Sequence, residues 1–483
     1  MMSNIKASEV SPDLAVSSVA KPERMLAGFP WVSAIVLYTL SWGWSLLRPN
    51  TLYWDDWAFF WRKSFISTSK VLHSMGYPPW TGIVEFALLN AGAWAVRVET
   101  YFVFFGAGIF LHILITSFPK LTLVTRQKIV LLFLIVPVNH ARISMIENDD
   151  ATSYFLFFLA WMLLICFSNW KSFVLSIVLF FLSFKTPSIL FFMPLPLLQL
   201  FILKKREILK VKSFSRVHFK IFTIGIVPVL YVILRKIFWF PPENMRDYQH
   251  ITYEGLRVGL LPLLVGLLCL LFVTVRKRET GLTGIGVNML IYGFLITCLA
   301  LFPYFAGEFY VGYKGRPAYI TVFEFRADWR SRYQLLMPLG LALSVVGLNE
   351  LLNWKKKNLI LSVVLVVSVG LNMFWGSQYF LQSLKQEKMV ELLKETKNKV
   401  VIASLGDQTI RFNGRENTFR SYEWDGFMIL AGIATDRPGC EALPNGSVLV
   451  LKSDKPYLSA LISRDLGLYF DVTPCTELLA KDS

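Results

Sequence analysis

The chain has 483 residues, of which 54% are hydrophobic and only 17% are charged, and its mean hydropathy is +0.51. Soluble domains usually carry about 25% charged residues, so the composition excludes an ordinary soluble protein and predicts a polytopic membrane protein. The formal net charge is +16. Because the basic residues fall between apolar segments, we expect them in cytoplasmic loops and do not expect nucleic acid as a partner.

Residues 1–30 begin with a polar stretch of mixed charge that lacks the short apolar core and small-residue cleavage site of a signal peptide. We predict that they form a cytoplasmic tail. The apolar run that follows, 31–47, is long enough to remain in the membrane as an anchor.

Apolar runs of about 17–25 residues can cross a bilayer as helices. The sequence contains about eleven runs that we interpret in this way, although 127–138 and 172–184 are short for a full span. They lie at 31–47, 100–118, 127–138, 151–167, 172–184, 187–203, 221–239, 256–275, 284–303, 333–352 and 359–379. Residues 82–96 are apolar but shorter, and we predict that they lie along the membrane interface.

The loops between these runs predict the orientation. With the N-terminus in the cytoplasm, every second loop is basic and almost free of acidic residues, as the positive-inside rule requires. These loops contain Lys120, Arg126 and Lys128, then Lys171, then seven basic residues between 204 and 220, then Arg276–Arg278, and finally Lys355–Lys357. The pattern favours an odd number of crossings in a bacterial inner membrane, with a periplasmic C-terminus.

Residues 381–483 are no longer apolar enough for the membrane. A Lys/Glu-rich amphipathic helix is predicted at 381–399, and short strands are predicted at 400–403 and 448–451, with turn residues between them. We expect a small α/β domain in the periplasm. Two of the five cysteines, Cys440 and Cys475, lie in this region, and a disulfide between them is an open possibility.

The first predicted outer loop, 48–99, contains Asp55-Asp56-Trp57. Adjacent carboxylates are not tolerated in hydrocarbon, so they must face water or a protein cavity. One interpretation is a hydrated turn that caps a helix. The other is a catalytic pair, in which Asp55 or Asp56 is the general base that activates a hydroxyl nucleophile.

Further charged residues fall on the same predicted side. A second acidic cluster, Glu147-Asn148-Asp149-Asp150, either caps the next helix or joins Asp55 in holding a divalent cation such as Mg²⁺ or Mn²⁺. Positive charge for a departing phosphate is available on the same side. The candidates for binding substrate or phosphate are Trp57, His140, Arg142, Lys185, Arg330 and Arg332.

An N-terminal span followed by a long outer loop with Asp55-Asp56-Trp57 resembles the C-type glycosyltransferases (GT-C), and Glu147–Asp150 is similar to the acidic motif of their second loop. The resemblance covers the architecture of residues 31–380. It implies an all-α polytopic fold, a polyprenyl-phosphate-linked sugar donor, a glycan or pilin-like protein acceptor, and a first-loop aspartate as base or metal ligand. The chain also resembles bacterial O-antigen (lipopolysaccharide) glucosyltransferases and arabinosyltransferases that act on pilin or cell-wall polymer.

Two other functions fit many of the same features. A transporter or flippase of lipid-linked oligosaccharide also has many spans, but it places charged residues near mid-bilayer, whereas here they gather at the ends of the spans. An O-antigen polymerase or ligase also uses polyprenyl carriers, but we expect such an enzyme to centre on Arg-rich outer loops and not on an early Asp-Asp pair.

Overall fold

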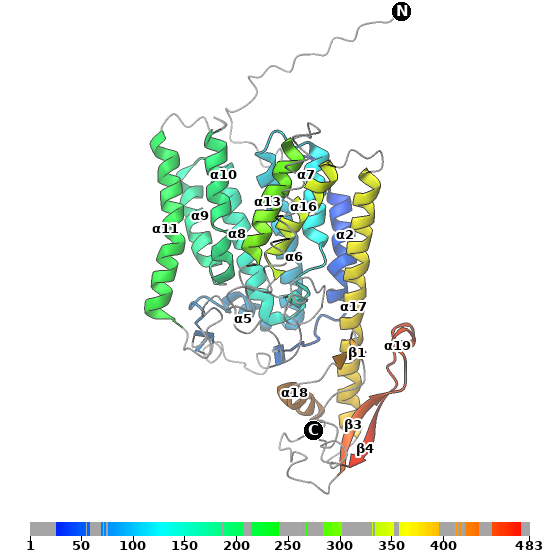
Figure 1. Ribbon diagram of the computed structural model, residues 1–483. Coiled ribbons are helices and arrows are strands. Elements are labelled where there is room, and N and C mark those ends of the chain that lie inside the picture. Colours follow the sequence, from blue (N-terminus) through cyan, green and yellow to red (C-terminus); the bar gives the residue numbers. More distant parts are fainter. Residues whose placement is uncertain are drawn as a thin grey trace, which may run out of the picture.

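The computed structural model describes residues 26–54, 56–57, 69–70, 72–73, 76–185, 187–205, 214–240, 264, 267, 284–301, 331, 334–351, 357–395, 411–412, 415–416, 421–433 and 447–474 (Figure 1). These residues are mostly helical. Four helices are long and apolar enough to cross a membrane: Ala93–Thr116, Met145–Cys166, Val217–Phe238 and Asn358–Glu395. The mostly helical fold is therefore confirmed and is consistent with a helical membrane protein, while the full count of about eleven crossings stays a prediction.

Most of the predicted apolar runs that lie in the described residues are helices. They are α2 (Trp31–Trp42), α6 (Ala93–Thr116), α7 (Leu123–Ile135), α8 (Asn148–Cys166), α9 (Trp170–Ser183), α10 (Pro194–Lys205), α11 (Phe214–Phe238), α13 (Gly284–Ala300), α16 (Met337–Leu351) and α17 (Lys357–Glu395). The short helices η2 (Gly43–Leu46), η3 (His140–Ile143), η4 (Met145–Glu147) and η5 (Pro187–Phe192) lie between them. Apart from residues 264 and 267, the run predicted at 256–275 lies outside the described residues.

The predicted interfacial helix at 82–96 is divided into two parts. Helix α5 spans only Ile83–Leu89, and Gly92, with φ of 122°, separates it from α6, which begins at Ala93. A positive φ of this kind is readily adopted only by glycine, so the chain changes direction here. Helix α6 therefore begins seven residues earlier than the apolar pattern indicates, and it includes the charged residues Arg97 and Glu99.

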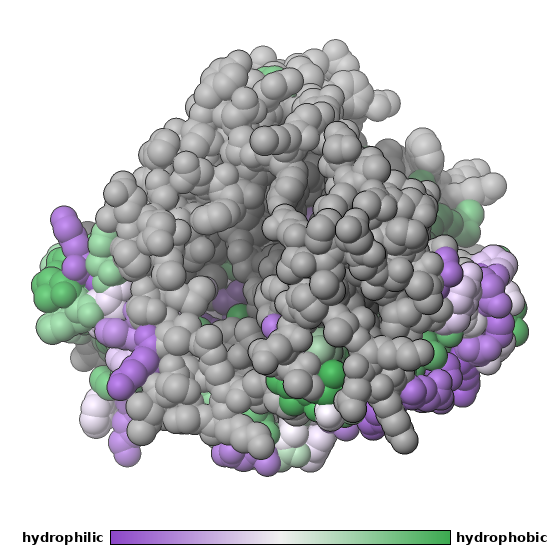
Figure 2. Space-filling view, turned by 90° about the horizontal axis from the view of Figure 1, so that it is seen from below, coloured by the Kyte–Doolittle hydropathy of each residue, from purple (hydrophilic) through white to green (hydrophobic). Residues whose placement is uncertain are grey.

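The long helices from α2 to α11 alternate in direction through the bundle, and so do those from α13 to α17 (Figure 1). We call the end at which α2 ends and α6 and α8 begin the lower end, and the opposite one the upper end. Lys120 lies between α6 and α7 at the upper end, and Lys128 and Lys171 lie in the first turns of α7 and α9 at the same end. Hydrophilic residues reach the surface around the edge of the lower end (Figure 2).

Aromatic side chains form much of the core. Phe157 is fully buried, and its ring centroid lies 5.3 Å from that of Phe180 on the neighbouring α9. In contrast, α11 and α17 expose large apolar side chains, including Phe222 (68% exposed) and Val366 (70% exposed). Water would disfavour such surfaces, whereas a lipid bilayer solvates them.

Helices α13 and α16 approach each other through glycines. Gly286 and Gly293 are seven residues apart on α13, and Gly340 and Gly347 have the same spacing on α16. A Cβ atom at Gly340 would lie 2.7 Å from the backbone nitrogen of Thr297 and 2.9 Å from the carbonyl oxygen of Gly293. Small residues at such positions let membrane helices pack closely, and backbone atoms on both sides leave no room for a side chain.

Gly340→Ala is expected to destabilise the protein by about 1–3 kcal/mol, the usual cost of overpacking. Gly370→Ala on α17 is the matched control, because nothing lies within 4 Å of a Cβ atom there. Thermal unfolding of both variants in one detergent tests the prediction. Equal unfolding temperatures for the two alanine variants would show that the α13–α16 contact is not tight.

The C-terminal part packs against α17. This helix continues without a break for 39 residues, so the amphipathic helix predicted at 381–399 is an extension of the last span. Beyond it lie α18 (Ser421–Ala431), α19 (Tyr457–Ser463) and four strands, β1 (Arg411–Phe412), β2 (Arg415–Glu416), β3 (Ser447–Ser453) and β4 (Leu468–Pro474).

Strand β3 pairs with β4 in antiparallel register, with Val450 opposite Asp471, and β1 pairs with β2. The strand predicted at 448–451 is thus confirmed. The strand predicted at 400–403, Cys440 and Cys475 lie outside the described residues.

Candidate active site at the lower end of the bundle

Asp56 is fully buried, and both of its carboxylate oxygens accept hydrogen bonds. Oδ1 accepts from Ser144 Oγ, from Met145 N at 2.7 Å and from Ile146 N at 3.2 Å, while Oδ2 accepts from Tyr53 N at 3.0 Å. The first loop is thereby fixed to the backbone that begins η4 and α8. Asp56 is therefore not the hydrated turn of one sequence interpretation: its carboxylate is buried, and it accepts from the first N–H groups of a helix 88 or more residues along the chain.

Arg97 completes this arrangement from the first turns of α6. It is 4% exposed, and its Nη2 lies 3.6 Å from Asp56 Oδ2. Its guanidinium also donates to the carbonyl oxygens of Pro49, Thr51 and Ile143, so three separate segments meet at one side chain. Burial raises the pKa of Asp56 to about 6, and the neighbouring Arg97 opposes that rise.

Asp56 therefore holds the loop in place, since its lone pairs are already occupied. Its neighbour Asp55, the other half of the predicted catalytic pair, lies outside the described residues. Trp57 is 2% exposed, and its ring centroid lies 4.7 Å from that of Phe427 on α18. Gly426 makes room for it, because a Cβ atom there would lie 2.2 Å from Trp57 Cε3.

A second buried charged group surrounds Lys185, between α9 and α10. Lys185 Nζ lies 2.5 Å from Asp149 Oδ2, and Asp149 Oδ1 accepts from Gly82 N at 3.3 Å. Glu147 and Glu85 interact with the same ammonium group through space. The sequence thus correctly predicted that the second acidic cluster and Lys185 share one end of the bundle, but Lys185 is neutralised by a carboxylate.

Glu85, on α5, is a member of this group that the sequence did not single out. It is 1% exposed, and its Oε1 has no hydrogen-bond partner among the described residues. Burial raises the pKa of Glu85, and burial lowers the pKa of Lys185, while their mutual attraction opposes both shifts. Burial therefore disfavours the charged form of both groups, and each partly offsets that cost for the other.

His140 and Arg142 occupy a third polar region, between α2, α7 and α17. His140 is fully buried and shares a hydrogen bond of 3.0 Å with Asn372 Oδ1 on α17. Burial lowers its pKa to about 3, so the imidazole is neutral at pH 7 and carries no charge for a phosphate.

Arg142 stacks on Trp42, with its Cζ 3.3 Å from the ring centroid, and it donates to the carbonyls of Asn139 and Val138. It forms no ion pair with a carboxylate in the described part of the chain. Together with Arg97 it lines a small cavity of about 20 Å³ between α2 and α6. An uncompensated guanidinium of this kind favours an anion.

No group of three His, Cys, Asp or Glu side chains within the described ranges is arranged to hold a metal ion. Asp149 is committed to Lys185, and Asp150 lies at the start of α8 and is half-buried. The predicted metal site included Asp55, so it stays a prediction, as does the role of Arg330 and Arg332, which also lie outside the described residues.

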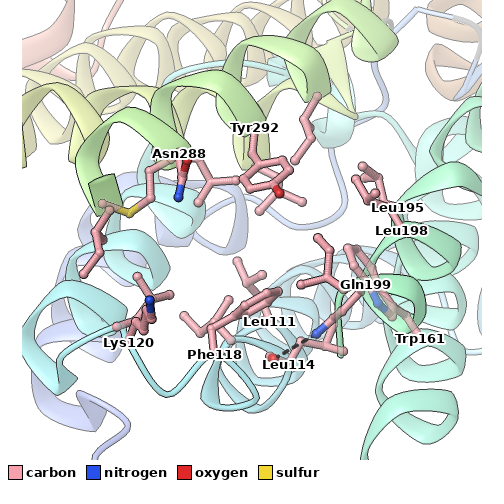
Figure 3. A pocket seen from close by; sticks show the side chains of 18 residues that line it. Leu111, Leu114, Phe118, Lys120, Trp161, Leu195, Leu198, Gln199, Asn288 and Tyr292 are labelled. Atoms are coloured by element: carbon pink, nitrogen blue, oxygen red, sulfur yellow. Dashed lines mark hydrogen bonds between the residues drawn. The ribbon is translucent and has the colours of Figure 1, made fainter. Parts of the chain in front are cut away.

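An apolar cavity of about 170 Å³ lies in the upper half of the bundle (Figure 3). Leu111 and Leu114 of α6, Trp161 of α8, and Leu195 of α10 line it, and Gln199 Nε2 donates to the carbonyl of Leu114 at 3.3 Å. Its lining suits hydrocarbon, and it lacks the carboxylates and arginines of the lower end.

Comparison with known proteins gave no match: no family model, no curated protein and no solved structure is similar to the chain. What the candidate site can do chemically is therefore inferred from its geometry alone. That geometry offers a buried carboxyl, Glu85, with an unsatisfied oxygen, a lysine held among acids, and Arg142, which pairs with no carboxylate among the described residues, all supplied by segments at the lower end.

Proposed function

We propose that the chain is a glycosyltransferase of the bacterial inner membrane, which moves a sugar from a polyprenyl-phosphate donor to a glycan or protein acceptor at the lower end of the bundle. The observation that carries the proposal is the gathering of buried Asp56, Arg97, Glu85, Asp149 and Lys185 at this end of an otherwise apolar bundle. Buried charges are costly in a membrane protein and usually serve function.

Asp55 keeps the role of general base in this proposal. Asp56 fixes the segment that precedes α5 through Tyr53 N and Ser144 Oγ, so the backbone beside Asp55 is anchored on both sides. Such anchoring is the usual way to hold a catalytic carboxylate in position. Asp56 itself is a positioning residue, because its oxygens are already occupied.

In the reaction, an acceptor hydroxyl oxygen forms a bond to the anomeric carbon of the donor sugar. The bond between that carbon and the phosphate oxygen breaks, and polyprenyl phosphate leaves with the electron pair. The hydroxyl proton passes to the Asp55 carboxylate. Arg142 is the described candidate for the phosphate, because it has no carboxylate partner among the described residues and lies beside the aromatic residues Trp42 and Trp44.

The carboxylates around Lys185 have a separate role. Burial raises the pKa of Glu85, so its carboxyl can exchange hydrogen bonds with a sugar hydroxyl through Oε1, which has no partner among the described residues, while Lys185 balances the charge of Asp149. The lower end, with the elements beyond Glu395, would then face the periplasm, and the basic upper end the cytoplasm.

Asp55→Asn is expected to abolish sugar transfer while leaving membrane insertion and protein abundance unchanged. The readout is mass analysis of surface glycans and glycoproteins from cells that lack the gene and are complemented with wild type or variant. Complementation should restore one hexose or pentose unit with the wild type and with the control variant, but not with Asp55→Asn. Glu350→Gln is the control, because Glu350 pairs with Lys128 at the upper end, 3.5 Å away.

Full transfer by the Asp55→Asn variant would contradict the assignment of the base. An unchanged glycome, accompanied by an altered distribution of the lipid carrier between leaflets, would contradict the transferase proposal and favour a flippase.

A further inference from the structure

A pocket of about 510 Å³ lies outside the helix bundle, below its lower end. Three elements form it: the segment 47–52 after α2, the last turns of α17, and α18. Its volume is within the range of about 300–1,000 Å³ that is usual for small-molecule sites. The segment 47–52 also supplies the Pro49 and Thr51 carbonyls that accept from Arg97, so the pocket adjoins the charged group around Asp56.

The pocket has an apolar wall and a polar rim. Trp57, Phe427 and Leu52 are buried at the wall, where the rings of Trp57 and Phe427 meet edge to face. On the rim, Arg48 pairs with Glu387, and Gln386 Nε2 donates to the carbonyl of Leu52 at 2.6 Å.

Two groups on the rim can still form an ion pair or a hydrogen bond with a ligand. Lys394 forms no ion pair with a described carboxylate, and the Asn50 amide uses its oxygen to accept from Trp94 N at 3.3 Å, which leaves its NH₂ group as a donor. The rim therefore carries net positive charge. A compact polar ligand that is neutral or acidic fits this lining better than a cationic one.

Saccharides match the two kinds of lining. A pyranose ring presents apolar C–H faces, which pack on aromatic and aliphatic side chains, and hydroxyl groups at its edge, which bond to amide, guanidinium and ammonium groups. A volume of about 510 Å³ holds a few sugar units, whereas an extended peptide needs a long groove or a free strand edge.

The pocket is also continuous in the chain with the proposed catalytic loop. Trp57, at its wall, comes directly after Asp56 and two residues after Asp55, and Leu52 at the same wall precedes them. A ligand held here would be anchored on the segment that carries the proposed base.

We propose that this pocket binds the glycan acceptor, with a sugar ring against Leu430 and its hydroxyl or acidic groups on Lys394 and Asn50. The inference rests on the proposed glycosyltransferase function and names the acceptor class of that reaction as a saccharide.

Pocket filling tests this assignment. Leu430 lines the pocket and is 44% exposed, whereas its neighbour Ile429 is 45% exposed and is not part of the lining. Leu430→Trp is expected to weaken binding of the saccharide by about tenfold or more, and Ile429→Trp to leave it unchanged. Lys394→Gln should weaken it as well, with Lys388→Gln, on the same helix, as the control.

The measurement is saturation-transfer NMR on the full chain in nanodiscs, with di- to hexasaccharides prepared from delipidated surface polysaccharide as the probe. Unchanged binding in Leu430→Trp would overturn the inference. Saturable binding of synthetic peptides to the same pocket, with none of saccharides, would overturn it too and indicate a protein acceptor.

Failure of the inference and failure of the proposed function give different results. If only the pocket assignment fails, the Leu430→Trp enzyme transfers sugar with an unchanged KM for the acceptor. If the proposed function fails, the wild type transfers no sugar, whatever the pocket binds.

Discussion

Asp56→Asn is expected to lower the free energy of unfolding by about 3–5 kcal/mol, the usual cost of breaking a buried ion pair by removing one partner. The side chain of Asp56 is completely buried and that of Arg97 is 3% exposed, with 3.6 Å between Oδ2 and Nη2. An asparagine amide group would also place N–H donors against Tyr53 N or against the donors at Ser144 and Met145. Thermal unfolding in detergent measures the loss.

A double-mutant cycle separates the pair from general disruption. Arg97→Met leaves the Asp56 carboxylate without its counter-charge, so the double variant should lose less stability than the sum of the two single variants. Glu391→Gln is the control, since Glu391 belongs to a solvent-exposed pair with Lys388 and should cost less than about 1 kcal/mol. Simple additivity of Asp56→Asn and Arg97→Met would contradict the pairing.

The stability lost in Asp56→Asn is expected to depend on pH. Burial raises the pKa of Asp56 from 3.8 to about 6. A carboxyl with a higher pKa in the folded chain binds more protons there, so its contribution to stability falls as the pH rises from about 4 to about 6. The asparagine variant does not titrate. The stability difference between wild type and variant should therefore widen as the pH is lowered from about 6 to about 4.

The sequence predicted the helices well because each depends on a local property, a long apolar run. It predicted the helix boundaries less well where a helix continues from an apolar segment into a polar one. Helix α17 continues past Trp375 to Glu395 although its apolar pattern ends, because no proline interrupts it and its lower turns pack on Phe427 and Leu468. The amino-acid composition changes after Trp375, whereas the backbone hydrogen bonding of the helix continues unchanged.

For the candidate site, the sequence placed Asp56, Asp149, Lys185 and Arg142 at one end of the bundle. It could not tell that Asp56 is buried by contacts with Ser144 and Met145, which lie about ninety residues further along the chain. Glu85 and Arg97 were missed as members of the site, although a signal existed. Each is a lone charge at or near an apolar run, and such a charge must find a partner when the run is buried.

Lys185→Met is expected to have an equally large effect, about 3–5 kcal/mol, because three buried carboxylates lose their cation. Lys185 Nζ lies 2.5 Å from Asp149 Oδ2, and Glu85 and Glu147 are attracted to the same charge. The matched control is Lys455→Met, in an exposed pair with Asp465, which should cost less than about 1 kcal/mol. Thermal unfolding again gives the comparison.

A second substitution tests whether Glu85 is the carboxylate that destabilises Lys185→Met. Glu85→Gln removes a carboxylate whose Oε1 has no hydrogen-bond partner among the described residues, so Lys185→Met/Glu85→Gln should regain part of the stability lost by Lys185→Met. A double variant that is as unstable as Lys185→Met, or less stable, would show that Glu85 and Lys185 do not act on each other.

The pH dependence of Lys185→Met follows from the two opposed shifts. In the wild type, burial raises the pKa of Glu85 to about 8 and lowers the pKa of Lys185 to about 7. Their contributions have opposite signs: that of Glu85 falls as the pH rises towards 8, and that of Lys185 grows as the pH rises above 7. Without Lys185 only the Glu85 trend remains, and its pKa rises further because the neighbouring positive charge is gone. The stability difference between Lys185→Met and the wild type should therefore widen as the pH rises above 7, the reverse of the direction expected for Asp56→Asn.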